Sequence, residues 1–163
     1  MLVLNDEILA SASQDETIKI WNLTDNSLKK TFSLEGSSIS SLVVLKDGNL
    51  ISGSNNFSSS EIIIWNIKIG NYVKKYPIYN SYIFCLQVLQ DETVASGLND
   101  NRILIWNIIE GKIKIILKGH TASIASLALL NNQLLASGSA DAIINIWNPY
   151  NGTLIRTIIF NHN

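Results

Sequence analysis

Three side chains near the end of the chain, Ser137, His120 and Asp141, are of the types that form the catalytic triad of a serine hydrolase. Such a triad also needs an exposed nucleophile and hydrogen-bond donors for the oxyanion of the intermediate. Ser137 stands instead inside an apolar, strand-like segment, LASGS. We therefore interpret the three residues as structural, and we expect no catalytic residue and no enzyme activity.

Metal and cofactor sites have less support from the sequence. The two histidines, His120 and His162, are a whole repeat apart and have no close cluster of cysteines or carboxylates. The single cysteine, Cys85, can form neither an intrachain disulfide nor a metal site alone, and we expect it to be a small apolar residue in a strand. The glycines lack the spacing of a phosphate-binding loop. We expect no metal and no cofactor.

The composition narrows the classes of partner. Apolar residues make up 47% of the 163 residues, which is enough for a folded core. The 12 basic and 13 acidic residues are scattered, whereas binding along a nucleic acid needs clustered cations. No apolar run approaches the roughly 20 residues of a membrane helix, and the N-terminus does not resemble a signal peptide. We expect neither nucleic acid nor membrane as a partner, and a location in the cytoplasm, with the nucleus as the alternative.

Four tryptophans reveal an internal repeat. They follow one another at intervals of 44, 41 and 41 residues, and each is preceded by Ile and followed by Asn: Trp21, Trp65, Trp106 and Trp147. A fixed period of this length is typical of repeat architectures.

Other positions recur with the tryptophans. A serine precedes the tryptophan by ten residues in three repeats, namely Ser11, Ser96 and Ser137. In the second repeat Ser52 stands thirteen residues before Trp65, so that repeat carries a three-residue insertion within residues 55–60. Aspartates that we interpret as turn residues stand six residues before the tryptophan at Asp15, Asp100 and Asp141, where the second repeat has Ser59. A residue suited to a left-handed turn stands five residues after it: Asn26, Gly70, Gly111 or Gly152.

Each repeat predicts four antiparallel strands in about 41 residues. Residues 17–21 alternate in character and are rich in β-branched side chains, as a half-buried strand should be. A strand of small residues precedes them, an apolar strand such as 123–130 comes before that, and a fourth strand such as 153–160 follows the turn. One such unit cannot bury both of its faces, but units stacked around an axis can, as in a β-propeller.

With these features the sequence resembles the WD-repeat family over nearly its whole length. The fourth repeat matches most fully, with Gly119-His120, LASGS at 135–139, Asp141 and INIWN at 144–148. The resemblance implies a structural hydrogen-bond tetrad of Asp141, His120, Ser137 and Trp147. In it the indole N–H would bond the Ser137 hydroxyl, the hydroxyl would bond one ring nitrogen of His120, and the other ring nitrogen would bond the Asp141 carboxylate.

The chain also departs from the family pattern. Asn replaces the name-giving Asp after every tryptophan, and only the fourth repeat has the Gly-His pair. The second repeat has Gly36-Ser37 in that region and the third has Tyr79, so we expect these blades to lack the full tetrad and to be looser.

We therefore expect an all-β fold, a β-propeller of about four four-stranded antiparallel WD-repeat blades that forms an incomplete ring or an arc of a larger propeller. The single region 1–163 divides into blades at 1–33, 34–76, 77–118 and 119–163. Met1 aligns with Leu127, which shortens the first strand, and residues 161–163 stand where a further blade would begin. A ring completed by a second copy and a closed four-bladed ring are the alternatives.

The resemblance implies that partners dock on the face where the innermost strands and the turn aspartates lie. Residues that flank the first buried isoleucine of each inner strand point to this face: Ser38 and Ser40, Tyr82 and Phe84, and Ser123 and Ala125. Residues before the turn aspartates, and the insertion, belong there too: Gln14, Asn99, Ala140 and Phe57. Tyr82 and Phe84 are either aromatic anchors for a partner or packing beside the channel.

The predicted function is a non-catalytic scaffold or adaptor that presents this top face to other proteins. One alternative is a self-assembling element in which copies of the arc complete a ring, so a homo-oligomer or further blades are the alternative partners. The second alternative is a module that binds a peptide or nucleic acid in the central channel. That function needs an acidic cage or a basic rim, and the sequence shows neither clearly.

Overall fold

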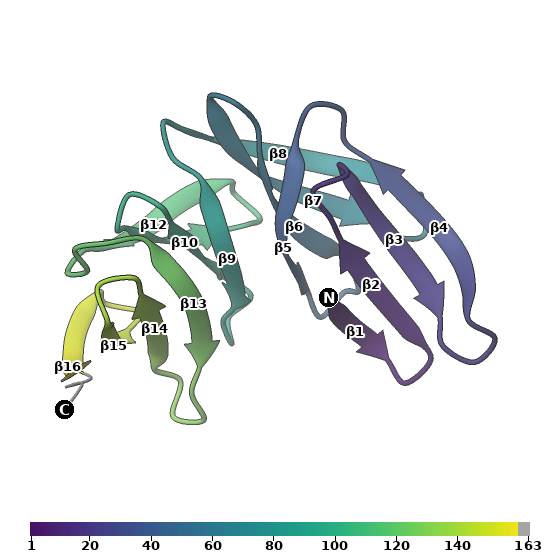
Figure 1. The fold of residues 1–163 in the computed structure, drawn as a ribbon. Helices are drawn as coiled ribbons and strands as arrows, with labels where there is room; N and C mark the ends of the chain where they lie inside the picture. The colour runs from purple at the N-terminus through teal and green to yellow at the C-terminus, as the bar shows by residue number, and fades with distance from the viewer. Residues whose placement is uncertain (160–163) are drawn as a thin grey trace. The chain divides into compact units, whose positions relative to one another are not determined.

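The computed structural model describes residues 1–159 and contains sixteen β-strands (Figure 1). Consecutive groups of four strands form four separate antiparallel sheets, and each sheet follows the order of the chain. We call these sheets blades 1 to 4. Residues 1–159 contain no helix, and so none that could cross a membrane. The expected all-β class with four four-stranded antiparallel blades is confirmed, and it is consistent with an incomplete propeller.

The chain divides into two compact units, Met1–Ile83 and Phe84–Asn163. Unit 1 holds blades 1 and 2. The strands of blade 1 are β1 Leu2–Asn5, β2 Ile8–Ala12, β3 Thr17–Asn22 and β4 Ser27–Ser33. Those of blade 2 are β5 Ser38–Val44, β6 Leu50–Asn55, β7 Ser59–Asn66 and β8 Asn71–Tyr79.

Unit 2 holds blades 3 and 4, although the first residue of its first strand, Ile83, is counted with unit 1. The strands of blade 3 are β9 Ile83–Val88, β10 Val94–Leu98, β11 Ile103–Asn107 and β12 Lys112–Leu117. Those of blade 4 are β13 Ile124–Leu129, β14 Leu135–Ser139, β15 Ile143–Asn148 and β16 Thr153–Ile159. Residues 161–163, where the sequence suggests the start of a further blade, lie outside the described part of the chain.

One expected boundary needs correction. The sequence placed the end of blade 2 at residue 76, but β8 continues to Tyr79. The insertion lengthens the preceding hairpin, in which Asn55 pairs with Ser60 in β6 and β7. The longer β7 then gives β8 further partners, because Ser60 also pairs with Ile78.

The turn after each tryptophan strand explains why Asn can replace Asp there. The fifth residue after the tryptophan is left-handed in all four blades, with φ of 57°, 88°, 70° and 79° at Asn26, Gly70, Gly111 and Gly152. The Asn directly after the tryptophan accepts backbone N–H groups of the turn through its Oδ1, as Asn107 does from Ile109 at 3.0 Å. An amide oxygen accepts such bonds as a carboxylate does, so this position needs an acceptor and not a charge.

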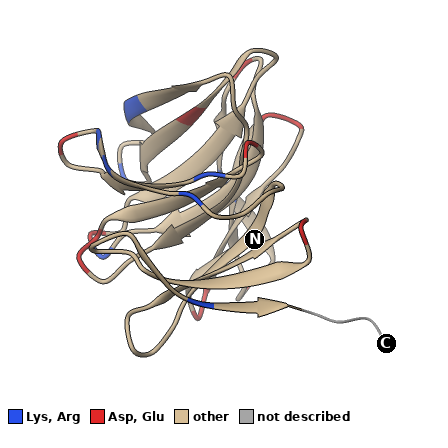
Figure 2. Ribbon diagram, turned by 90° about the vertical axis from the view of Figure 1, so that its left-hand side faces the viewer, with Lys and Arg blue, Asp and Glu red and all other residues tan. Residues whose placement is uncertain are grey.

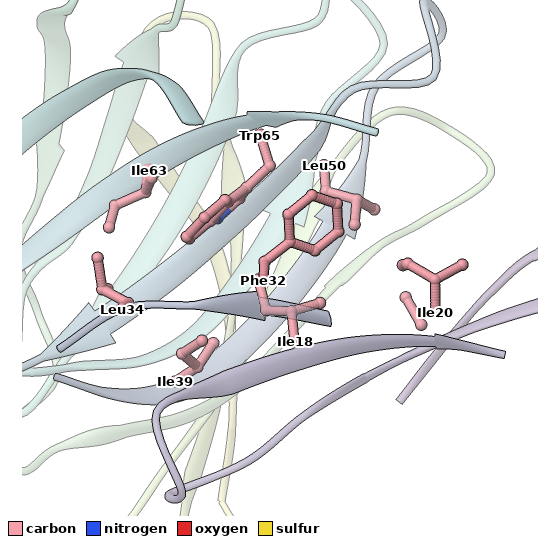
Figure 3. Close-up of a cluster of buried hydrophobic side chains, with 9 residues drawn as sticks. Ile18, Ile20, Phe32, Leu34, Ile39, Leu50, Ile63 and Trp65 are labelled. Atoms are coloured by element: carbon pink, nitrogen blue, oxygen red, sulfur yellow. The ribbon is translucent and has the colours of Figure 1, made fainter. Parts of the chain in front are cut away.

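The core of unit 1 lies between its two blades (Figure 3). We call the side of a blade that meets the next blade in the chain its trailing face, and the side that meets the preceding blade its leading face. The trailing face of blade 1 supplies Ala10, Ile18, Ile20 and Phe32. The leading face of blade 2 supplies Ile39, Leu50 and Trp65. The Phe32 and Trp65 rings lie 5.5 Å apart at 53°, a tilted arrangement that aromatic pairs favour.

The core of unit 2 repeats this arrangement. The trailing face of blade 3 supplies Ala95, Ile103, Ile105 and Leu117. They pack on the leading face of blade 4, made by Ile124, Leu135 and Trp147. The two junctions share these positions of the repeat, and they differ at others, since Ile63 and Leu34 are also in the core of unit 1 and Leu89 is in that of unit 2.

Candidate functional site

The four residues of the predicted tetrad lie in one hydrogen-bonded chain in blade 4. The Trp147 indole N–H donates to the Ser137 hydroxyl at 2.8 Å, and this hydroxyl lies 2.7 Å from Nε2 of His120. Nδ1 of His120 lies 2.9 Å from the Asp141 carboxylate. Every donor in this chain meets an acceptor if the neutral His120 carries its proton on Nδ1. Nδ1 then donates to the Asp141 carboxylate, and Nε2 accepts from the Ser137 hydroxyl.

Asp141 also binds two backbone N–H groups, one in the segment before β13 and one at the start of β15. Its carboxylate accepts the N–H of Thr121 at 2.8 Å and the N–H of Ile143 at 3.0 Å. Desolvation by itself would raise the pKa of Asp141, but the hydrogen bonds from Thr121, His120 and Ile143 outweigh it and hold that pKa below its usual value. The tetrad therefore ties the loop before β13 to the turn between β14 and β15.

The Trp–Ser pair is common to all four blades. The indole N–H donates to the serine hydroxyl at 2.9 Å in blades 1 and 2, at 3.0 Å in blade 3 and at 2.8 Å in blade 4. In blade 2 the pair forms despite the insertion, which lies in the hairpin beyond it. Tyr79, which stands near the histidine position of the third repeat, is exposed and does not take the place of His120.

Within unit 1, four of the predicted top-face residues line a single hollow of about 400 Å³: Gln14, Ser38, Phe57 and Tyr82. Its other lining residues, which the sequence did not single out, are Glu16, Gly36, Asn55 and Asn56. Ser40 is exposed on β5 beside this set, but its hydroxyl donates to the Gly53 carbonyl at 3.0 Å and it does not line the hollow. Gln14, Ser38 and Phe57 of the insertion therefore lie close together in this unit.

Hydrogen bonds hold the insertion in place. The Asn56 side chain accepts the N–H groups of Ser58 at 3.0 Å and Ser59 at 2.9 Å, which closes the tip of the hairpin. The Tyr82 hydroxyl donates to the Phe57 carbonyl at 3.1 Å. With its backbone held in this way, the Phe57 side chain is 101% exposed.

Asn55 fastens the hollow to the strand that follows. Its amide donates to the Ile83 carbonyl at 2.8 Å and its Oδ1 accepts the Ile83 N–H at 2.9 Å. Sequence reasoning missed Asn55 because its partner lies 28 residues away. The run Asn55-Asn56 in the insertion was the only available signal, since Asn favours tight turns.

The hollow carries little charge. Glu16 is the one lining residue with a formal charge, and it is half-buried. The neighbouring Asp15 is engaged elsewhere: its hydrogen bond from the Thr17 hydroxyl, with others from Ser13 and Lys19, lowers its pKa to about 2. Over residues 1–159, acidic and basic residues are interspersed and many acidic ones mark turns (Figure 2).

In unit 2 the remaining predicted residues are spread over both blades. Phe84 and Ala125 are exposed, and Asn99 is half-buried. Ala140 is exposed too, and its N–H donates to the carbonyl of the half-buried Ser123 at 3.0 Å. None of these five lines the hollow of about 280 Å³ in this unit, whose lining is Asp100, Asn101, Arg102, Lys118, Gly119 and His120.

Two further sequence expectations concern reactive groups. Cys85 is half-buried in β9, and burial raises the pKa of its thiol to about 12, so the thiolate is scarce at neutral pH. Residues 1–159 contain no group of three or more His, Cys, Asp or Glu side chains placed to hold a metal ion.

Repeated four-stranded antiparallel blades, each with a Trp–Ser pair, define the class of β-propeller-type repeat proteins. The family model described as WD domain, G-beta repeat matches residues 4–22 and 111–148. The first region runs from within β1 to the end of β3, and the second contains all four tetrad residues. These two regions span 57 of the 163 residues, and over them the chain is similar to the WD-repeat family. Among curated proteins, no relative matches the chain.

Proposed function

We propose that the chain is a non-catalytic protein-interaction module that binds a partner protein through the hollow of unit 1. WD repeats generally serve as protein-interaction scaffolds, and the specific role is our proposal. It depends on one observation: Gln14, Ser38, Phe57 and Tyr82, which come from separate segments, line one hollow beside a fully exposed aromatic ring.

The chemistry of the hollow favours a peptide segment of a partner. Amide and hydroxyl groups can bond a peptide backbone, and the rings of Phe57 and Tyr82 offer apolar contact at low entropic cost. Glu16 supplies the one formal charge, so the segment is neutral or basic. The mixed surface charge supports a protein and not a nucleic acid as the partner.

The burial of Ser137 supports a non-catalytic role. Its relative exposure is 0%, and its hydroxyl already bonds Trp147 and His120. A substrate carbonyl could not reach it without opening the blade. A serine-reactive fluorophosphonate probe should therefore leave the folded chain unlabelled, and labelling of Ser137 would contradict this assignment.

We also propose that the module works in the cytoplasm or the nucleus. The lone, half-buried cysteine suits a reducing compartment. Microscopy of a fluorescently tagged chain tests this, and a secreted or organelle-confined pattern would contradict it.

The partner proposal is tested by comparing variants as baits. Wild type, Phe57→Ala and the double variant Tyr82→Ala/Phe84→Ala are used in affinity purification with mass spectrometry. Phe57→Ala should lose the partner while its thermal midpoint stays unchanged, because the ring makes no buried contact. Truncation of an interface anchor costs about 2 kcal/mol or more, or roughly 30-fold in affinity.

Ile69→Ala is the matched control. Ile69 is also strongly exposed in unit 1, at 72%, but it lies in the turn between β7 and β8 and does not line the hollow. It should capture partners as wild type does. Equal capture by all four proteins would reject the hollow as the docking site.

A further inference from the structure

Glu16, which lines the hollow of unit 1, occupies a turn position that does not itself need a carboxylate. It directly follows the turn aspartate of blade 1, and its backbone is left-handed, with φ of 69°. The equivalent residues of blades 3 and 4 are Asn101 and Ala142, and they are also left-handed, with φ of 71° and 63°. Because an alanine suffices at this position in blade 4, the turn does not explain the acidic side chain of Glu16.

The Glu16 carboxylate is also unpaired. Within residues 1–159, no hydrogen bond or ion pair reaches it. The turn aspartates beside this position are engaged, since Asp15 pairs with Lys19 at 3.3 Å and Asp100 pairs with Arg102. Glu16 is half-buried in the wall of the hollow, so its charge is available to a ligand that enters there.

Two aromatic rings line the same hollow. Phe57 is fully exposed at the tip of its hairpin, and the Tyr82 hydroxyl holds the Phe57 carbonyl at 3.1 Å. Tyr82 is itself 36% exposed. The faces of aromatic rings attract cations, and none of the residues that line this hollow is basic. The hollow therefore offers two kinds of group that bind a cation, and it supplies no cation of its own.

The charge of a partner's side chain decides how well it fits this site. A neutral side chain placed over Glu16 would remove water from the carboxylate and give nothing in return. An acidic side chain would be repelled. A basic side chain would replace the lost water with an ion pair, and its apolar stem would cover the rings.

We propose that the hollow selects its partner segment by a basic side chain, whose cationic group pairs with Glu16 and lies against the rings of Phe57 and Tyr82. This inference rests on the proposed partner-binding role of the hollow and adds the class of side chain that it recognises. Ion pairs and cation–π contacts are each weak at exposed sites. Together they should favour a basic side chain over a neutral one of the same shape by about tenfold in affinity.

Selection from a displayed library of random peptides against the full chain tests the proposal. Counter-selection against Phe57→Ala removes peptides that bind elsewhere on the chain. The remaining peptides should contain Lys or Arg more often than the unselected library does. If they show no such enrichment, the inference is overturned while the hollow remains a peptide-binding site. If no peptide depends on Phe57, both this inference and the proposed docking site are rejected.

Calorimetry with the most enriched peptide then measures the preference for charge. Its basic residue is replaced by a neutral counterpart of similar shape, citrulline for Arg or acetyl-lysine for Lys. The neutral peptide should bind wild type about tenfold more weakly, and salt should reduce this difference because it screens an exposed ion pair.

Glu16→Gln assigns the preference to its carboxylate. This variant should bind the basic and the neutral peptide equally, and its thermal midpoint should equal that of wild type because the carboxylate has no partner to lose. Glu7→Gln is the matched control, since Glu7 is an exposed acid in the turn between β1 and β2 that does not line the hollow. It should keep the wild-type preference. The inference is overturned if Glu16→Gln keeps the preference, or if Glu7→Gln loses it to the same extent.

Discussion

The Ser137 hydroxyl bonds two buried polar groups, and water cannot reach them to take its place. Ser137 is fully buried, and its hydroxyl serves both the Trp147 N–H and Nε2 of His120. Each buried polar group left without a partner costs about 1–3 kcal/mol, so losing the partner of both should lower the free energy of unfolding of Ser137→Ala by about 2–6 kcal/mol. Urea unfolding followed by tryptophan fluorescence measures this loss.

Ser11→Ala in blade 1 is the matched control for that loss. Ser11 accepts the Trp21 N–H at 2.9 Å, but the pair is only partly buried, so water can take the place of the hydroxyl. The cost should be about 1 kcal/mol or less. Equal losses in the two variants would show that the His120 link adds nothing to the Trp–Ser pair.

Asp141 should make the stability of the fold sensitive to acid. Because its pKa in the folded state is depressed, its contribution is fully present above the unfolded pKa of about 3.9 and is lost as pH falls through the folded value. The stability difference between wild type and Asp141→Asn should therefore shrink as pH falls from about 5 toward 2. Urea midpoints at a series of pH values measure it, and a difference that does not change with pH would contradict the assignment.

The tetrad residues could be predicted because the repeat aligns them with a known pattern of donors and acceptors. The same alignment placed Phe57, Gln14 and Ser38 near one another. It could not predict the hydrogen bonds from Tyr82 to Phe57 and from Asn55 to Ile83. These bonds depend on an insertion that occurs in one repeat, so no periodic signal reports them.

At the scale of the strand, a glycine between two blades has to remain a glycine. A Cβ at Gly97 would lie 2.5 Å from the Cys85 sulfur and 2.6 Å from Ile124. Overpacking of this kind costs about 1–3 kcal/mol, and we expect Gly97→Ala to lower the free energy of unfolding by that amount. Thermal and urea unfolding measure the change.

Gly138→Ala tests whether the loss comes from the neighbouring blade. At Gly138 only the hydroxyl of the exposed Ser126 lies near, so the change should stay within about 0.5 kcal/mol. If both alanine variants lose the same stability, the loss belongs to the strand itself and not to packing between blades.

The strands themselves could be predicted from period and alternation, since Ile18, Ile39, Ile83 and Ile124 are buried where the pattern requires. The end of β8 could not. Its extension to Tyr79 follows from pairing with residues of the lengthened β7. The length of β8 is therefore set by its partner strand and cannot be predicted from the residues of β8 alone.

At the scale of the molecule, the repeat determines which surfaces are covered. The same positions are buried at the junctions inside units 1 and 2 and open on the leading face of blade 1 and the trailing face of blade 4. Repeat proteins gain stability from each added junction between neighbours. The junctions inside the two units therefore contribute stability that a separate blade would lack.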